Sequence, residues 1–211
     1  IFFLLRLLFY FYSMNYILFD GSSRNQLLPF TFTRPVAEIR IGILTIREKW
    51  ERLLGSTPST VTEDYLSGKW PLVEMPENIM INASFLPTPE FVSQIENLEE
   101  NQAIFHGEEV VAFYSLEDQE VDFQKYTQLE LLGDVLQIAH TWDIFSKNIE
   151  ALQLDFELLI RDRESEPIPA SNHVMAAHNI FIEKGAKVEF CSLNASTGPI
   201  YIGANSEIME G

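Results

Sequence analysis

Short apolar runs alternate with amphipathic stretches along most of the chain. Residues 15–19 are apolar and lead into a polar loop, and residues 78–81 repeat this arrangement, as buried parallel strands do. Residues 46–54 carry apolar side chains at helical spacing, and Gly55 follows where a C-terminal cap is expected. Together these segments predict buried strands connected through a helix.

Further elements of both kinds follow up to residue 160. The alternation of strands with helices predicts an α/β fold with a mostly parallel sheet. The pattern predicts a helix over 89–98, strands over 103–105 and 110–114 on either side of a turn at Gly107, and an amphipathic helix over 141–160 with Thr141 as its N-cap. The apolar face of the last helix would consist of Ile144, Phe145, Ile149, Leu152, Phe156 and Leu159.

A change in composition marks a domain boundary after this helix. Residues 161–171 contain two prolines and alternating charges, which is typical of a linker. We therefore predict one domain over residues 14–165, a linker over 166–178 and a second domain over 179–211.

The second predicted domain has a six-residue periodicity. Aliphatic side chains lie six apart at Ile182 and Val188 and again at Ile202 and Ile208. This spacing favours a β-solenoid, in which every sixth side chain points inward; an ordinary β-hairpin with accidental spacing is the alternative. Because a solenoid needs about three or more repeats to bury its core, we expect the sequence to be a fragment of a longer protein.

The segment before Met14 is apolar and aromatic apart from Arg6. Residues 1–13 are too short to span a bilayer, which takes about 20 apolar residues, and no small-residue cleavage site follows them. We interpret Met14 as the start of the protein and residues 1–13 as upstream or mis-start sequence. A signal or anchor segment is the alternative interpretation.

Charge narrows the choice of partners. The chain carries 14 basic and 31 acidic side chains, a formal charge of −17, which repels a nucleic-acid backbone. Anionic small molecules can still bind, since a pocket can gather a few Arg and Lys side chains and backbone N–H groups. Cys191 is the only cysteine, so no disulfide can form within the chain. These features favour a cytoplasmic protein with neither nucleic acid nor membrane as a partner.

The loop after the first predicted strand carries the most informative chemistry. Residues 20–24 read Asp-Gly-Ser-Ser-Arg. Glycine and hydroxyl residues at the carboxyl end of a parallel strand, followed by an arginine, can hold phosphates through backbone N–H groups and a guanidinium. The alternative is a surface loop in which Arg24 and Arg34 are solvated.

This loop resembles the signature of the sugar-phosphate nucleotidyltransferases, Leu-Ala-Ala-Gly-x-Gly-Thr-Arg-Leu-x-Pro-Leu-Thr-x-x-x-Pro-Lys. The chain is most similar to a Bacteroidetes-type relative of the bifunctional N-acetylglucosamine-1-phosphate uridylyltransferase/acetyltransferase, whose motifs correspond to residues 19–21, 27–35 and 194–203 here. The positions that match the signature are Leu18, Gly21, Arg24, Leu27 or Leu28, Pro29, Thr31 and Pro35.

The resemblance implies a Rossmann-like domain of the glycosyltransferase A type, followed by the start of a left-handed hexapeptide β-helix. It also implies that a sugar 1-phosphate oxygen attacks the α-phosphorus of a nucleoside triphosphate and that pyrophosphate leaves. Gly21, Ser22, Ser23 and Arg24 would bind the nucleotide, and Arg24 and Arg34 would be the catalytic residues that neutralise charge. A homotrimer formed through the full-length β-helix is expected as well.

Two positions depart from the signature. Val36 stands where the family has a lysine, and Ser84 lies in the segment where the family has a metal-binding aspartate. The resemblance implies Mg²⁺ as the cofactor, and Asp20 could supply the carboxylate instead; a loop-capping Asp20 is the alternative. The departures favour a second hypothesis, a catalytically degenerate module that binds a nucleotide sugar or supports a β-helix acyltransferase.

Overall fold

The computed structural model describes residues 14–210, so the interpretation of residues 1–13 lies outside the described part of the chain. Contacts divide the chain into two compact units, with the division between Asn148 and Ile149. The domain limits at residues 165 and 178 stay a prediction. None of the helices within residues 14–210 combines the length and apolar surface that a bilayer crossing requires.

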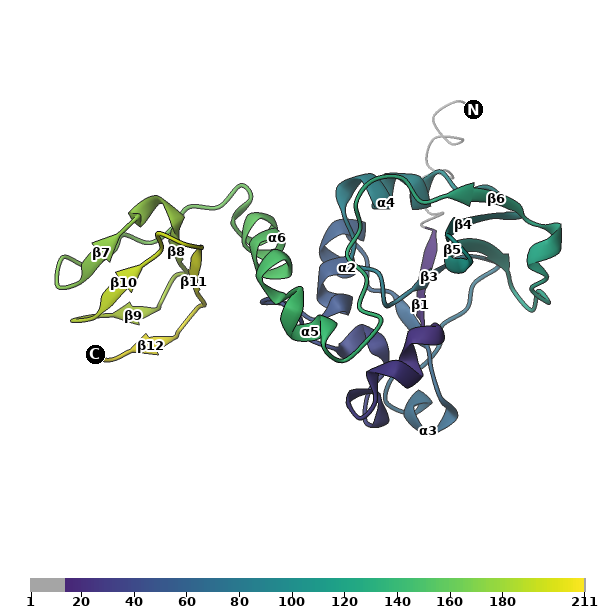
Figure 1. The fold of residues 1–211 in the computed structure, drawn as a ribbon, viewed down its shortest axis with the longest axis horizontal. Coiled ribbons are helices and arrows are strands. Elements are labelled where there is room, and N and C mark those ends of the chain that lie inside the picture. Colours follow the sequence, from purple (N-terminus) through teal and green to yellow (C-terminus); the bar gives the residue numbers. More distant parts are fainter. Residues whose placement is uncertain (1–13, 211) are drawn as a thin grey trace, which may run out of the picture. The chain divides into compact units, whose positions relative to one another are not determined.

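A six-stranded sheet forms the centre of the first unit (Figure 1). Its order is β2-β1-β3-β5-β4-β6, and only β5 runs against the other strands. The mostly parallel α/β sheet predicted from the sequence is therefore confirmed. The strands are β1 (Asn15–Phe19), β2 (Ser59–Val61), β3 (Glu77–Asn82), β4 (Gln102–His106), β5 (Glu109–Leu116) and β6 (Thr127–Glu130).

The apolar run of β1 is explained by its central place in the sheet. Ile17 pairs with Ser59 of β2 on one side and with Met80 of β3 on the other. The three middle residues of β1 are buried, because neighbouring strands cover both edges and packed side chains cover both faces. The short strands β2 and β6 lack such a run, and the sequence pattern does not predict them.

Helices α2 (Ile46–Leu54) and α4 (Pro89–Glu96) lie together beside the sheet, and α3 (Asp64–Ser67) follows β2 (Figure 1). The rings of Trp50 and Phe91 join α2 to α4 edge to face, with centroids 5.2 Å apart. Gly55 ends α2 in the left-handed conformation, at φ +66°. The predicted helix over 46–54 and its glycine cap are thus confirmed, and the helix predicted over 89–98 ends two residues earlier, at Glu96.

The single helix predicted over residues 141–160 is wrong. The structure instead has α5 (Asp143–Ser146) and α6 (Asn148–Ile160), and Thr141 does not cap either one. Two tertiary bonds interrupt the helix, because Lys147 Nζ donates to the carbonyl of Gln137 and Asn148 Oδ1 accepts the N–H of Gly42. Two members of the predicted apolar face, Phe145 and Ile149, are accordingly exposed.

Three two-stranded parallel sheets make up the β-structure of the second unit. Their paired residues lie about 20 positions apart, as in Ile180 with Ile200. The aliphatic positions of the six-residue pattern pair in register, Ile182 with Ile202 and Val188 with Ile208. The strands are β7 (His173–Met175), β8 (Ile180–Ile182), β9 (Lys187–Val188), β10 (Ser192–Asn194), β11 (Ile200–Ile202) and β12 (Glu207–Ile208). Their apolar side chains, with the thiol of Cys191, form a common buried cluster.

A charged cluster ties the segment after α6 to these strands. The Glu183 carboxylate accepts hydrogen bonds from the hydroxyl of Tyr201, the guanidinium of Arg163 and the N–H of Ala204. The Arg163 guanidinium also lies over the ring of Phe181. The hydrogen bonds from Tyr201 and Arg163 lower the pKa of Glu183 to about 2.

Candidate functional site

The segment 20–36 lies at the carboxyl edge of the sheet, where α/β proteins place their ligands. The N–H of Asp20 donates to the carbonyl of Val61, and the N–H of Ala83 donates to that of Phe19. These bonds join the residues that follow β1, β2 and β3. The segment folds into three short 3₁₀ turns, Ser22–Leu27, Phe30–Phe32 and Val36–Glu38.

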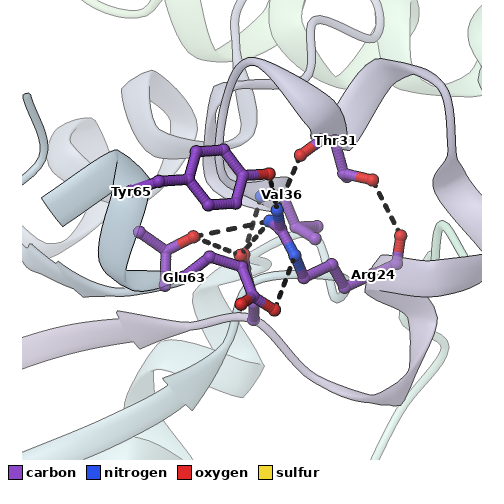
Figure 2. A network of polar contacts seen from close by, with 7 residues as sticks. Arg24, Thr31, Val36, Glu63 and Tyr65 are labelled. Carbon is purple, nitrogen blue, oxygen red and sulfur yellow. Dashed lines mark hydrogen bonds and ion pairs between the residues drawn. The ribbon is translucent and has the colours of Figure 1, made fainter.

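Arg24, which was predicted to bind the nucleotide, is buried inside this segment (Figure 2). Its Nη1 donates to Asp20 Oδ2 at 2.6 Å and its Nη2 donates to the carbonyl of Thr31 at 2.7 Å. The Thr31 hydroxyl returns a hydrogen bond to the Arg24 carbonyl at 2.8 Å. The Arg24 guanidinium therefore links Asp20 to Thr31 and stabilises the conformation of the loop.

The outer side of the Arg24 guanidinium meets the segment that follows β2. Nη2 donates to the Tyr65 hydroxyl at 3.0 Å, and Nε lies 3.4 Å from a carboxylate oxygen of Glu63 (Figure 2). The side chain of Glu63 is 54% exposed and that of Tyr65 is also largely exposed. These two partners, unlike Asp20 and Thr31, can be exchanged for phosphate oxygens without uncovering a buried group.

Asp20, the candidate metal ligand, already uses both of its carboxylate oxygens. Oδ1 accepts the N–H of Val36 at 2.7 Å, and Oδ2 accepts from Arg24 and, at 2.6 Å, from the hydroxyl of Thr62. Its side chain is only 5% exposed. Its burial and its ion pair with Arg24 fit a loop-capping aspartate and do not fit a Mg²⁺ ligand, which must be accessible to the ion and its water. Across residues 14–210 no three His, Cys, Asp or Glu side chains lie close enough to hold a metal ion.

A pocket of about 390 Å³ opens beside the loop, at the ends of β1 and β3 and the start of β5. The predicted nucleotide-binding residues Gly21 and Ser22 line it, whereas Ser23 is buried. Glu108 and Glu109 lie opposite them. The pocket therefore carries negative charge, which opposes the entry of a phosphate.

Hydrogen bonds hold the Glu109 carboxylate in place at this pocket. Oε1 accepts the Ser22 hydroxyl at 2.9 Å and the Asn82 amide at 3.2 Å, and Oε2 accepts the Gln137 amide at 2.6 Å. Glu109 is half-buried and lines the pocket. Sequence reasoning missed this residue, because Glu109 follows a hairpin turn and lies 87 residues from Ser22.

Asn82 also explains why residue 21 is glycine. A Cβ atom on residue 21 would lie 2.5 Å from Asn82 Nδ2. The amide cannot turn away freely, because Nδ2 also donates to the Val110 carbonyl and Oδ1 accepts the N–H and hydroxyl of Ser84. Ser84 is fully buried beneath this turn, so the position where the family has a metal-binding aspartate does not face the pocket.

The structure separates Arg34 from the other predicted site residues. Arg34 is exposed and lines a different pocket, with Arg40 and Lys69. Val36, at the position of the family lysine, is buried, and its N–H is bound by Asp20. Two of the positive charges expected at the phosphates are thus absent from the pocket beside Gly21.

Comparison with known families identifies the class of protein. A family model described as sugar nucleotidyl transferase matches residues 16–164, most of the chain. The chain therefore belongs to the sugar nucleotidyl transferase family, and its α/β sheet fits a Rossmann-like nucleotidyltransferase. The family implies a nucleotide and a sugar phosphate as substrates. A search of curated proteins finds no match.

Proposed function

We propose that the first unit joins a nucleoside triphosphate to a sugar 1-phosphate at the carboxyl edge of its sheet. A phosphate oxygen of the sugar 1-phosphate attacks the α-phosphorus, the bond between the α-phosphorus and the bridging oxygen breaks, and pyrophosphate leaves. The observation that carries the proposal is the pocket formed by Gly21, Asn82 and Glu109 within the segment that matches the family. Catalysis would consist of positioning and charge neutralisation.

The residues of the loop would position the nucleotide. Gly21 lets the backbone come close to a ligand, and the hydroxyl of Ser22 faces the pocket. Arg24 would keep its hydrogen bonds to Asp20 and Thr31 and so hold the loop in shape. Phosphate oxygens would replace Tyr65 and Glu63 on the other side of its guanidinium.

Glu109 is the side chain that fits a Mg²⁺ ion at this edge. Mg²⁺ in phosphoryl-transfer sites is held by one or two carboxylates, by water and by substrate phosphates. Glu109 offers such a carboxylate, fixed by Asn82 and Gln137, whereas Asp20 does not. When bound, the ion would neutralise charge on the triphosphate, and the carboxylate would no longer repel it.

The second unit supports a further part of the proposal. The in-register parallel pairs and their apolar cluster are those expected of the first coils of a left-handed hexapeptide β-helix. We propose an acyltransferase-type β-helix that assembles as a homotrimer in the cytoplasm. Light scattering of a longer chain would test the trimer, and a monomer at micromolar concentration would contradict it.

A non-catalytic role is the second candidate, because Val36 and Ser84 are both buried and neither supplies the family's charged group. One experiment separates the two functions. Purified protein is incubated with Mg²⁺, each of the common nucleoside triphosphates and a panel of sugar 1-phosphates, and pyrophosphate and nucleotide sugar are measured. Formation of both products supports the transferase. Thermal stabilisation by a nucleotide sugar without product indicates a binding module, and neither response indicates a structural role.

A further inference from the structure

A basic pocket lies apart from the proposed transfer site, although the protein as a whole carries a charge of −17. Arg34 and Arg40, from one segment, and Lys69, from the residues after α3, line one pocket of about 380 Å³, together with Thr33 and the ring of Trp70. Three cations around one pocket require an explanation, because like charges repel one another unless an anion lies between them.

The surrounding carboxylates do not neutralise this pocket. Glu38, which also lines it, is paired with Arg47, and Glu48 lies 3.6 Å from Arg40. Within residues 14–210, neither Arg34 nor Lys69 has an acidic partner. The guanidinium of Arg34 and the ammonium of Lys69 are therefore available to an anion such as a phosphate group.

This basic pocket shares no lining residue with the pocket beside Gly21. The pocket next to it shares Lys69 and Trp70 and is lined by Asn15 and Ser59, the first residues of β1 and β2. Gly21 and Glu109, by contrast, lie where β1 ends and β5 begins. The basic pocket thus extends toward the residues that begin β1 and β2, whereas the pocket beside Gly21 does not.

Side chains, not helix amides, would bind a ligand here. Thr45, the N-cap of α2, lines the basic pocket, but its capping box with Glu48 uses the N–H groups of both residues. The available donors are the guanidinium of Arg34, the ammonium of Lys69 and the hydroxyl of Thr33. An arginine with a lysine and a hydroxyl suits a phosphate group, because the planar guanidinium can bind two of its oxygens.

We propose that the basic pocket binds the phosphate group of a small molecule at a site separate from the nucleotidyl-transfer site. Lys69 Nζ lies 4.4 Å from the centroid of the Trp70 ring. A phosphate that draws the ammonium away from the ring changes the surroundings of the indole. Trp70 is therefore a local reporter of binding, and Trp142 in the same unit is an internal control.

The test uses NMR spectra of the ¹⁵N-labelled full chain, with the Trp70 indole signal assigned through Trp70→Phe. Inorganic phosphate, pyrophosphate and glucose 1-phosphate are titrated separately, with acetate at equal ionic strength as the control. We expect each phosphate compound to shift the Trp70 signal and to leave that of Trp142 in place. The compound that binds most tightly distinguishes free phosphate from a phosphorylated metabolite.

Two variants decide the assignment. Arg34→Ala removes an exposed side chain and leaves the Lys69–Trp70 pair that reports binding in place. It should weaken phosphate binding about tenfold, because the guanidinium that can bind two phosphate oxygens is lost. Arg52→Ala, an exposed arginine on α2, should bind as the wild type does. An unchanged affinity in Arg34→Ala, or an equal response to acetate, would overturn the proposal. Absence of nucleotide-sugar synthesis would not affect this result, so the two proposals fail separately.

Discussion

The guanidinium of Arg24 and the carboxylate of Asp20 form an ion pair of 2.6 Å with almost no exposed surface. Both residues belong to the stretch that resembles a phosphate-binding loop, yet here they bind each other. A buried carboxylate that loses its counter-charge is costly to the fold. The pair therefore gives the loop its shape before any ligand arrives.

Arg24→Ala should destabilise the first unit by about 3–5 kcal/mol, because it leaves Asp20 buried without a cation. Urea unfolding followed by tryptophan fluorescence measures the change. Arg52→Ala, which removes an exposed arginine, should change the free energy of unfolding by less than about 0.5 kcal/mol. A loss below about 1 kcal/mol for Arg24→Ala would show that the pair is not structural.

The spacing of apolar residues predicts the strand and the helix whose structure depends mainly on residues close together in the sequence. The run at β1 marks a strand covered on all sides, and the spacing before Gly55 marks an amphipathic helix with its cap. The predicted helix is interrupted at Lys147, which donates to the carbonyl of Gln137, and at Asn148, which accepts the N–H of Gly42. The helical spacing of apolar residues does not reveal these two bonds. Tertiary contacts thus overrode the apolar spacing.

The candidate site was predictable only in part, for the same reason. The stretch from Asp20 to Arg24 identifies the correct loop and the correct edge of the sheet. It does not show that Arg24 is turned toward Tyr65, 41 residues away, or that Glu109 lies opposite Ser22. Those relationships depend on how strands pair, and a single sequence does not record pairing.

Gly21→Ala should narrow the proposed pocket and destabilise the first unit. The new Cβ would meet the Asn82 amide at 2.5 Å, and overpacking of this kind costs roughly 1–3 kcal/mol. Gly68→Ala is the matched control, because a Cβ there has no atom within 4 Å and the residue is already in a helical conformation. Thermal unfolding compares the two.

A double-mutant cycle locates the clash. Removing the Asn82 side chain in the Gly21→Ala background should recover part of the loss, so the two substitutions should not be additive. Additive effects would mean that Gly21 serves some purpose other than the approach to Asn82.

The second unit should lose stability in acid through Glu183. Its folded pKa, about 2, lies below the ordinary value of 4.5, so the charged carboxylate stabilises the fold above pH 4.5. This contribution disappears as the pH falls from 4.5 toward 2, because the group then becomes protonated in both states. The protection factor of the Ala204 amide, which donates to Glu183, should fall over that interval.

Glu183→Gln tests the origin of this pH dependence. The variant should have a lower protection factor at the Ala204 amide at pH 6, and this factor should change little between pH 4.5 and 2. Glu189→Gln, at an exposed glutamate of the same unit, should behave as the wild type does. The same acid response in both variants would assign the effect to other groups.

Glu109→Gln should reduce nucleotide-sugar formation about 100-fold or more, if the proposed function is correct, because the neutral amide cannot neutralise or hold Mg²⁺. Folding should be little affected, since the new amide oxygen can still accept from Ser22 and Asn82, and the Gln137 amide can turn its oxygen toward the new NH2 group. Glu108→Gln, its exposed neighbour at the same pocket, is the matched control and should retain activity within about threefold, an effect on the scale of an exposed charge.

The dependence on Mg²⁺ distinguishes a metal ligand from a residue that only shapes the pocket. In Glu109→Gln the Mg²⁺ concentration for half-maximal rate should rise, whereas a purely structural role would lower the rate at every Mg²⁺ concentration equally. The response of Trp70 to phosphate should be the same in this variant as in the wild type, because Lys69 and Arg34 line a different pocket. If Glu108→Gln were the inactive variant and Glu109→Gln the active one, the hydrogen bonds that fix Glu109 would have no catalytic purpose, and the carboxylate of this site would have to be Glu108.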